Sequence, residues 1–131
     1  MPNQILIVED EPAVASMLAQ LLGRAGYEVH SAPTGGEALR YITDHHPDLV
    51  LLDLRLPDMD GFDVCKVMRQ ALVPWSLPIV MLTGRAKPTD QQRGFSIGAD
   101  AYLTKPCPPE HLLAIVERLL GEDANLPSPP C

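Results

Sequence analysis

Short apolar runs typical of strands take turns along this chain with stretches of helical spacing. Residues 5–8, 49–52 and 79–82 are continuous apolar runs, which are typical of strands buried on both faces. Residues 27–32 alternate only in part, which favours a strand at the edge of a sheet, and residues 101–104 form a shorter fifth segment. The pattern therefore predicts five strands.

Helical spacing fills the stretches between these strands. Five helices are expected to open near Pro12, at Thr34 with Glu37 as a capping box, at Asp60 or Gly61, at Thr89 with Gln92, and at Pro108–Pro109. The inner face of the third helix is expected to comprise Val64, Cys65, Met68 and Leu72. The fourth helix has the poorest apolar face, Phe95 and Ile97, and is expected to pack least firmly.

Strands that alternate with helices predict an α/β fold with a parallel sheet covered on both faces. We expect five strands in the order 2-1-3-4-5, flanked by five helices in a flavodoxin-like three-layer sandwich. This domain would span residues 1–121. The acidic and then proline-rich residues 122–131 are expected to be a tail or the start of a linker.

Polar residues follow four of the predicted strands. Glu9 and Asp10 end the first, Asp53 the third, Thr83 the fourth and Lys105 the fifth. Because the carboxyl ends of parallel strands lie side by side, these groups should converge in one pocket. Lys105 can neutralise one of the three carboxylates. Mg²⁺, which prefers oxygen ligands, can neutralise the other two. A carboxylate beside Mg²⁺ can attack phosphorus, so the pattern indicates phosphoryl transfer through an aspartyl phosphate.

Net charge and cysteine content indicate which partners and which cellular compartment to expect. With 10 Lys and Arg against 17 Asp and Glu, the formal net charge is −7, which argues against nucleic acid or an anionic membrane as the main partner. Three cysteines without Cys-x-x-Cys spacing favour a reducing compartment. No signal peptide pattern and no apolar run near the roughly 20 residues of a membrane span are found. We therefore expect a soluble cytoplasmic protein.

Four motifs at these strand ends resemble the receiver domain of two-component response regulators, of the chemotaxis-regulator type. They are Ile-Leu-Ile-Val-Glu-Asp-Glu-Pro at 5–12, Leu-Leu-Asp-Leu-Arg-Leu-Pro-Asp-Met-Asp-Gly at 51–61, Met-Leu-Thr-Gly at 81–84 and Tyr-Leu-Thr-Lys-Pro at 102–106. The resemblance extends from Gln4 to Gly121, and four motifs in this order make it highly specific.

The resemblance implies roles for the phosphoryl-binding residues. Asp53 is expected to be the phosphoacceptor, Thr83 to contact the phosphoryl group and Lys105 to pair with its oxygens. Tyr102 matches an aromatic switch position, whose ring turns inward when Thr83 moves towards the phosphoryl group. A half-buried tyrosine without a switching role stays an alternative. The Lys105–Pro106 bond is often cis in this family.

The resemblance also implies a metal site, and the sequence departs from the family pattern in places. Asp10 and Asp53 would bind Mg²⁺, Glu9 would act mainly through metal-bound water, and the backbone carbonyl of Arg55 would complete the set. Arg55 and Arg85 lie two residues after Asp53 and Thr83, where they would flank the attacking water and change the phosphoryl lifetime. Cys107 replaces a common phenylalanine; a packing role is favoured over a redox-sensitive thiol.

The function implied is that of a phosphorylatable signalling switch in a phosphorelay. A phosphohistidine on a sensor histidine kinase or a histidine phosphotransfer protein would supply the phosphoryl group. The face formed by the fourth helix, fifth strand and fifth helix would then control a downstream protein or output domain. Such a protein catalyses its own phosphotransfer and autodephosphorylation rather than turning over a substrate. Whether phosphorylation drives a homodimer, and whether the chain is stand-alone or cut from a longer protein, stay open.

The sequence argues against three alternative functions. A flavin-binding domain needs a Ser/Thr/Gly-rich loop where this chain has Glu9-Asp10-Glu11. A haloacid-type phosphatase needs Asp-x-Asp, which Asp53-Leu54-Arg55 does not supply. The remaining alternative is a degenerate receiver that acts as a phosphorylation-independent protein-binding module. The complete set of Asp53, Thr83 and Lys105 speaks against it.

Overall fold

Strands and helices alternate along the chain as predicted. The computed structural model describes residues 2–72 and 77–121, with no side chains for residues 71 and 72, so the predicted tail (122–131) and the predicted inner position of Leu72 lie outside its description. The strands are β1 (Gln4–Val8), β2 (Glu28–Ala32), β3 (Leu49–Leu52), β4 (Ile79–Thr83) and β5 (Ala101–Thr104). The helices are α1 (Pro12–Arg24), α2 (Gly35–Asp44), α3 (Gly61–Val67), continued by a π-helical turn (Met68–Leu72), α4 (Pro88–Ser96) and α5 (Pro109–Leu119).

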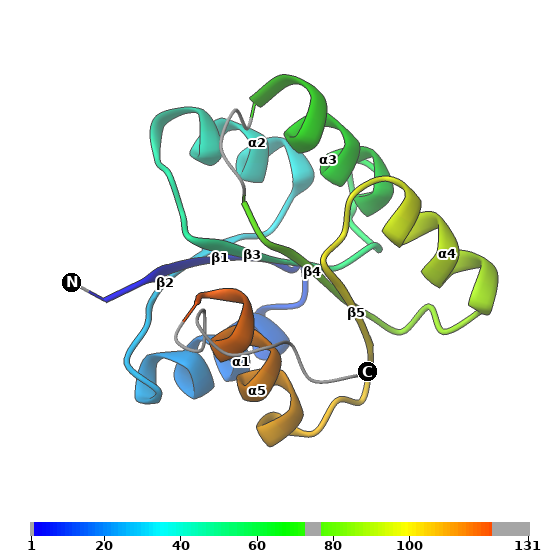
Figure 1. The fold of residues 1–131 in the computed structure, drawn as a ribbon. Coiled ribbons are helices and arrows are strands. Elements are labelled where there is room, and N and C mark those ends of the chain that lie inside the picture. Colours follow the sequence, from blue (N-terminus) through cyan, green and yellow to red (C-terminus); the bar gives the residue numbers. More distant parts are fainter. Residues whose placement is uncertain (1, 73–76, 122–131) are drawn as a thin grey trace.

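The five strands form one parallel sheet in the order β2-β1-β3-β4-β5, which confirms the predicted topology. Figure 1 shows α1 and α5 on one face of this sheet and α2, α3 and α4 on the other, with β2 at the edge. None of the described helices is long and apolar enough to cross a membrane.

Alternate residues of each central strand supply the two halves of the core. In β1, Leu6 and Val8 pack with residues of α2 and α3, while Ile5 and Ile7 pack with residues of α1 and α5. All four side chains are buried. Two buried faces explain why the central strands have continuous apolar runs rather than alternating ones.

Two helix starts show where the capping predictions succeed and fail. At α2, the Thr34 hydroxyl accepts a hydrogen bond from the Glu37 N–H (3.1 Å), as predicted. At α4, the predicted cap at Thr89 is wrong: the capping position is Lys87, which makes no side-chain cap, and the helix begins at Pro88. Proline suits this first position because its φ is already helical and the position needs no N–H donor.

The inner face of α4 is even sparser than its sequence suggests. Gly94 is the one buried residue among those described in α4. Phe95, expected on the inner face, is 52% exposed, so that expectation is wrong, whereas Ile97 beyond the helix end packs against the core. A Cβ on Gly94 would lie 2.9 Å from Met81 Sδ and from the Tyr102 ring. The helix therefore turns its glycine inward to let β4 and β5 side chains approach.

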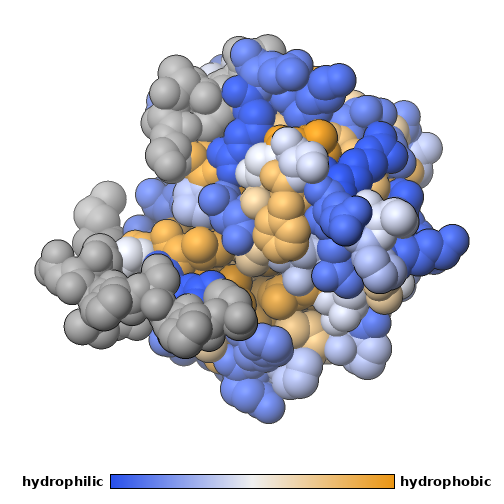
Figure 2. All heavy atoms as spheres, turned by 45° about the vertical axis from the view of Figure 1, so that its right-hand side comes forward, coloured by the Kyte–Doolittle hydropathy of each residue, from blue (hydrophilic) through white to orange (hydrophobic). Residues whose placement is uncertain are grey.

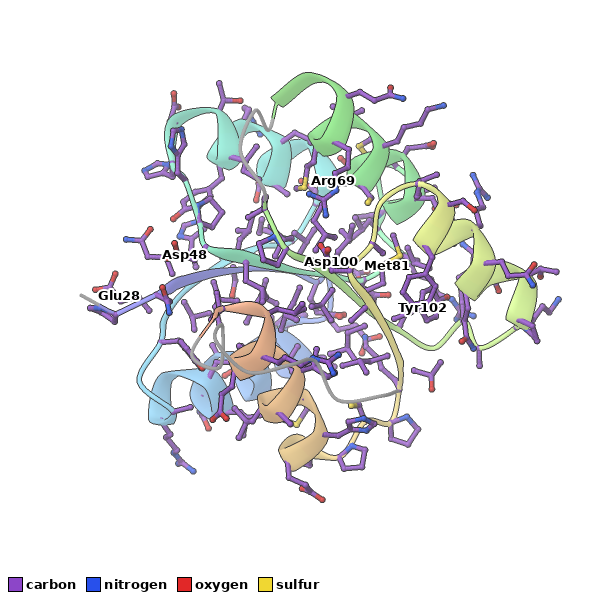
Figure 3. The ribbon with its side chains drawn as sticks, viewed as in Figure 1. Glu28, Asp48, Arg69, Met81, Asp100 and Tyr102 are labelled. Carbon is purple, nitrogen blue, oxygen red and sulfur yellow. The ribbon has the colours of Figure 1, made fainter. Side chains whose placement is uncertain are left out.

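Arg69 ties three segments together at the amino ends of β4 and β5. Its guanidinium donates to the carbonyls of Gly98 and Leu77 and forms an ion pair of 2.7 Å with Asp100. The same Asp100 oxygen accepts from the Ile79 N–H at 2.9 Å. Figure 3 shows Arg69 and Asp100 pointing towards one another above β4 and β5.

We expect Arg69→Met to destabilise the domain by about 2 kcal/mol, because hydrogen bonds to a charged group are worth roughly 1.5–3 kcal/mol and several acceptors lose their donor. Urea unfolding measures this loss. Arg40→Met, at an exposed position of α2, is the matched control and should change the unfolding free energy by less than about 0.5 kcal/mol. Equal midpoints for both variants would show that the Arg69 contacts contribute nothing.

Candidate functional site

The sheet brings the predicted site residues together at its carboxyl edge. Backbone hydrogen bonds continue one residue beyond the strands: the Asp53 N–H donates to the Val8 carbonyl (3.0 Å), and the Lys105 N–H to the Thr83 carbonyl (2.8 Å). The Glu9 N–H likewise donates to the Ala32 carbonyl at 3.1 Å. These bonds fix the backbone at Glu9, Asp53, Thr83 and Lys105.

Lys105 joins two carboxylates that are almost fully buried. Its Nζ lies 2.8 Å from Glu9 Oε2 and 3.1 Å from Asp53 Oδ2. The Glu9 and Asp53 side chains are 2% and 7% exposed, whereas that of Lys105 is 27% exposed. One ammonium therefore serves two buried carboxylates, which leaves the site with excess negative charge.

The pKa values reflect this imbalance. Burial raises the pKa of Glu9, the nearby charge of Asp53 adds to the rise, and Lys105 opposes it without cancelling it. Burial disfavours the charged form of Lys105, but hydrogen bonds and attraction from Glu9 and Asp53 outweigh burial and raise its pKa. Lys105 thus stays charged at neutral pH, and the site favours a further cation.

Three carboxylates could hold such a cation. One oxygen each from Glu9, Asp10 and Asp53 lies within 4.8 Å of the other two, and Asp10 is exposed while the others are buried. An all-oxygen donor set at an open edge suits a hard divalent cation such as Mg²⁺, which keeps several waters. The Arg55 N–H donates to Asp53 Oδ1 at 3.2 Å, so the backbone of the following loop lies beside this group.

Gly61 lets this loop close tightly against its own start. A Cβ at Gly61 would lie 2.6 Å from the Asp53 carbonyl oxygen, and the Gly61 N–H donates to the Leu54 carbonyl at 3.0 Å. A backbone bridge also joins Arg55 and Asp60. Residues 54–61 are therefore a closed loop, which we call the β3–α3 loop.

The backbone N–H and carbonyl of Arg85 connect the two predicted switch residues, Thr83 and Tyr102. Buried Thr83 accepts from the Arg85 N–H at Oγ1 (3.3 Å), and the Tyr102 hydroxyl donates to the Arg85 carbonyl (2.6 Å). The Tyr102 ring is half-buried beside Met81, under α4 (Figure 3). Burial and the charge of Asp90 raise the pKa of Tyr102, which keeps its hydroxyl a donor. A movement of Thr83 would thus reach Tyr102 through one residue.

The Arg85 side chain makes contacts that the sequence did not indicate. It pairs with Asp60 at 3.4 Å and with Asp90 at 3.1 Å, and its guanidinium carbon lies 5.0 Å from the centre of the Phe62 ring. Arg93 also lies over this ring, at 4.4 Å. The cluster joins the starts of α3 and α4, and no periodic signal in the sequence could have revealed these pairs.

The residues after Lys105 favour packing over redox chemistry. The Lys105–Pro106 bond is cis. Half-buried Cys107 makes a long contact (3.7 Å) with the Pro108 carbonyl, and burial together with the charge of Glu110 raises its pKa. A raised pKa disfavours the reactive thiolate. Cys107 and Pro106 instead line an apolar groove of about 550 Å³ between α1 and α5.

Comparisons with known proteins agree on one family. The profile of the response regulator receiver domain matches residues 5–117. The chain is 41% identical over 120 residues to the alkaline phosphatase synthesis transcriptional regulatory protein PhoP of Bacillus subtilis, covering 92% of this chain and 49% of that protein. It is 40% identical over 128 residues to the DNA-binding response regulator MtrA of Mycolicibacterium smegmatis, covering 98% of this chain and 55% of the relative. The chain therefore spans about half the length of these curated relatives.

Solved structures share the whole fold. A CheY-like receiver domain protein from Methanospirillum hungatei superposes with a TM-score of 0.88 at 35% identity, covering 95% of this chain and 98% of the other. The BeF3-activated N-terminal receiver domain of RstA from Klebsiella pneumoniae gives a TM-score of 0.85 at 37% identity, with coverage of 90% and 98%.

Proposed function

This chain belongs to the response regulator receiver domain family, and we propose that it is a signalling switch phosphorylated on Asp53. The observation that carries the proposal is the contact of Lys105 with both Asp53 and Glu9, at the carboxyl end of the central strand β3. A buried carboxylate with an ammonium at 3.1 Å suits attack on phosphorus, because phosphoryl transfer depends mainly on positioning and charge neutralisation.

Mg²⁺ would be held by Glu9, Asp10, Asp53 and the backbone carbonyl of Arg55. When bound, it would neutralise negative charge on the phosphoryl oxygens and on the carboxylates. Oxygen donors and uncompensated negative charge at the site support this assignment. Glu9 would act mainly through metal-bound water.

Asp53 would form a bond from one carboxylate oxygen to phosphorus, while the bond from phosphorus to the donor imidazole nitrogen breaks and its electron pair stays on that nitrogen. Lys105, already in contact with Asp53, would pair with a phosphoryl oxygen. The Thr83 hydroxyl, whose oxygen accepts from the Arg85 N–H, would donate its hydrogen to another. The donor would be a phosphohistidine on a sensor histidine kinase or phosphotransfer protein, in the cytoplasm.

Movement of Thr83 would be transmitted through the backbone of Arg85 to Tyr102 and to the surface around α4. Figure 2, which turns the α4 and β5 side forward, shows apolar surface in the middle of this face with polar side chains around it. Phe95, exposed on α4, adds apolar area there. We propose this α4–β5–α5 face as the contact site for a downstream protein, an output domain or a second copy. Nucleic acid is not expected to bind the receiver itself.

The proposal is tested by incubation with Mg²⁺ and phosphoramidate, followed by intact mass spectrometry. We expect one added phosphoryl group that is labile to hydroxylamine, as acyl phosphates are, and that does not form when EDTA removes the metal. A degenerate receiver acting as a phosphorylation-independent binding module would show no such addition. That outcome would overturn the proposed function.

Replacing both Arg55 and Arg85 by alanine should speed dephosphorylation. The Arg85 charge is already paired with Asp60 and Asp90, so its main effect on attacking water would be steric. Opening the path should raise the hydrolysis rate by roughly tenfold or less, which corresponds to about 1.4 kcal/mol of activation free energy. Decay of the phosphorylated species by intact mass measures the rate, with Arg40→Ala as control; an unchanged rate rejects the role.

A further inference from the structure

The tip of the β3–α3 loop is fixed to the start of α2 by one carboxylate. Asp58 Oδ1 accepts from the Gly35 N–H at 2.9 Å, and Oδ2 accepts from the Gly36 N–H at 2.8 Å. A helix leaves its first N–H groups without intrahelical acceptors, and Asp58 satisfies two of them from a distant loop. The N–H groups of Gly36 and Gly35 lower the pKa of Asp58, so the carboxylate is charged at neutral pH.

The two glycines allow this close approach. A Cβ on Gly35 would lie 2.5 Å from Met59 Cγ and 2.8 Å from Val64 Cγ2. A Cβ on Gly36 would lie 3.2 Å from Asp58 Oδ2. The loop tip is thus docked through two adjacent residues, by hydrogen bonds at Asp58 and by packing at Met59.

The loop is closed at its other end beside the candidate metal site. The Arg55–Asp60 bridge and the bond from the Gly61 N–H to the Leu54 carbonyl hold its base together. Because the loop is short and closed, the position of its tip constrains Arg55, three residues before Asp58. Asp58 is not one of the three clustered carboxylates, so any effect on a metal would be indirect.

We propose that Asp58 is a positioning residue for the metal site: by docking the loop tip on α2, it holds the Arg55 backbone beside Asp53. This inference rests on the proposed function, in which the Arg55 carbonyl is a metal ligand. Partners that orient metal ligands typically change affinity by 10–100-fold when lost, and an indirect contact belongs at the lower end, roughly tenfold.

Mn²⁺ binding measured by electron paramagnetic resonance, with Mg²⁺ as competitor, tests the proposal. Asp58→Ala should weaken binding by roughly tenfold. Asp58→Asn keeps an acceptor oxygen for one of the two N–H groups but turns an NH₂ group towards the other, so it should recover only part of the loss. Asp63→Ala is the matched control, because it removes one negative charge at an exposed position of α3 and should change affinity far less. Equal affinities for Asp58→Ala and Asp63→Ala would overturn the inference.

A second variant separates positioning from stability. Gly36→Ala keeps the charge of Asp58 and favours the helix, but its Cβ would crowd Asp58 Oδ2. The variant should therefore bind Mn²⁺ more weakly than the wild type without a lower unfolding temperature. Wild-type Mn²⁺ affinity in this variant would overturn the inference even if Asp58→Ala failed to fold. With phosphoramidate, Asp58→Ala should need more Mg²⁺ for half-maximal phosphorylation but reach the wild-type rate at saturation. If the wild type itself neither bound Mn²⁺ nor became phosphorylated, the proposed function would fail instead.

Discussion

Asp53→Asn is expected to abolish phosphorylation by phosphoramidate and Mg²⁺ entirely, because the amide cannot act as the nucleophile. The variant should stay folded. It removes one of two buried carboxylates that share a single ammonium, so Lys105 and Glu9 can still pair. Intact mass spectrometry measures the phosphorylated fraction, and urea unfolding confirms the fold.

Asp63→Asn is the matched control for this substitution. It makes the same chemical change at an exposed position of α3, ten residues further along the chain. We expect it to be phosphorylated like the wild type. Phosphorylation of Asp53→Asn at the wild-type level would show that another group is the acceptor.

Lys105→Met should impair both stability and phosphotransfer. Breaking a buried pair by removing one partner costs about 3–5 kcal/mol, and since the Lys105 side chain is 27% exposed, we expect a smaller loss of about 2 kcal/mol. The phosphorylation rate should fall roughly a hundredfold, as when one donor to a developing oxyanion is lost. Urea unfolding and the time course of phosphorylation measure the two effects.

Added Mg²⁺ should restore part of the stability of Lys105→Met, because a bound cation would neutralise the carboxylates that lost their ammonium. Added Mg²⁺ should therefore raise the unfolding free energy of Lys105→Met by more than it raises that of the wild type. Lys66→Met, at an exposed position of α3, is the control and should behave like the wild type in both measurements. A Lys105→Met variant as stable and as reactive as this control would contradict the proposed roles.

The fold and the main site could be predicted because their signals are local. Strands buried on both faces leave continuous apolar runs, as at residues 49–52, and the residue after each run identifies a strand end. Parallel strands then bring those ends together, which is why Glu9, Asp53 and Lys105 were predicted to meet and do. Thr83 ends the neighbouring strand, and its carbonyl accepts from the Lys105 N–H. The cis Lys105–Pro106 bond was indicated by the family resemblance rather than by any pattern in the chain.

The parts that escaped prediction depend on tertiary distance or on a small rotation of a helix. The cap of α4 lies at Lys87, two residues before the expected Thr89, and Gly94 rather than the adjacent Phe95 lies on the inner face of α4. Long side chains such as Arg69 and Arg85 find partners far away in sequence. The contact of Asp58 with the start of α2 spans 23 residues to Gly35, and no spacing rule links the two.

Direct chemical location of the phosphoryl group tests whether Asp53 is the phosphoacceptor. Borohydride reduction of the phosphorylated wild-type protein converts an aspartyl phosphate to homoserine, and peptide mass spectrometry identifies the position. We predict homoserine at position 53, formed only when both Mg²⁺ and the phosphodonor are present. Homoserine at another carboxylate position, with Asp53 unmodified, would show that Asp53 is not the phosphoacceptor.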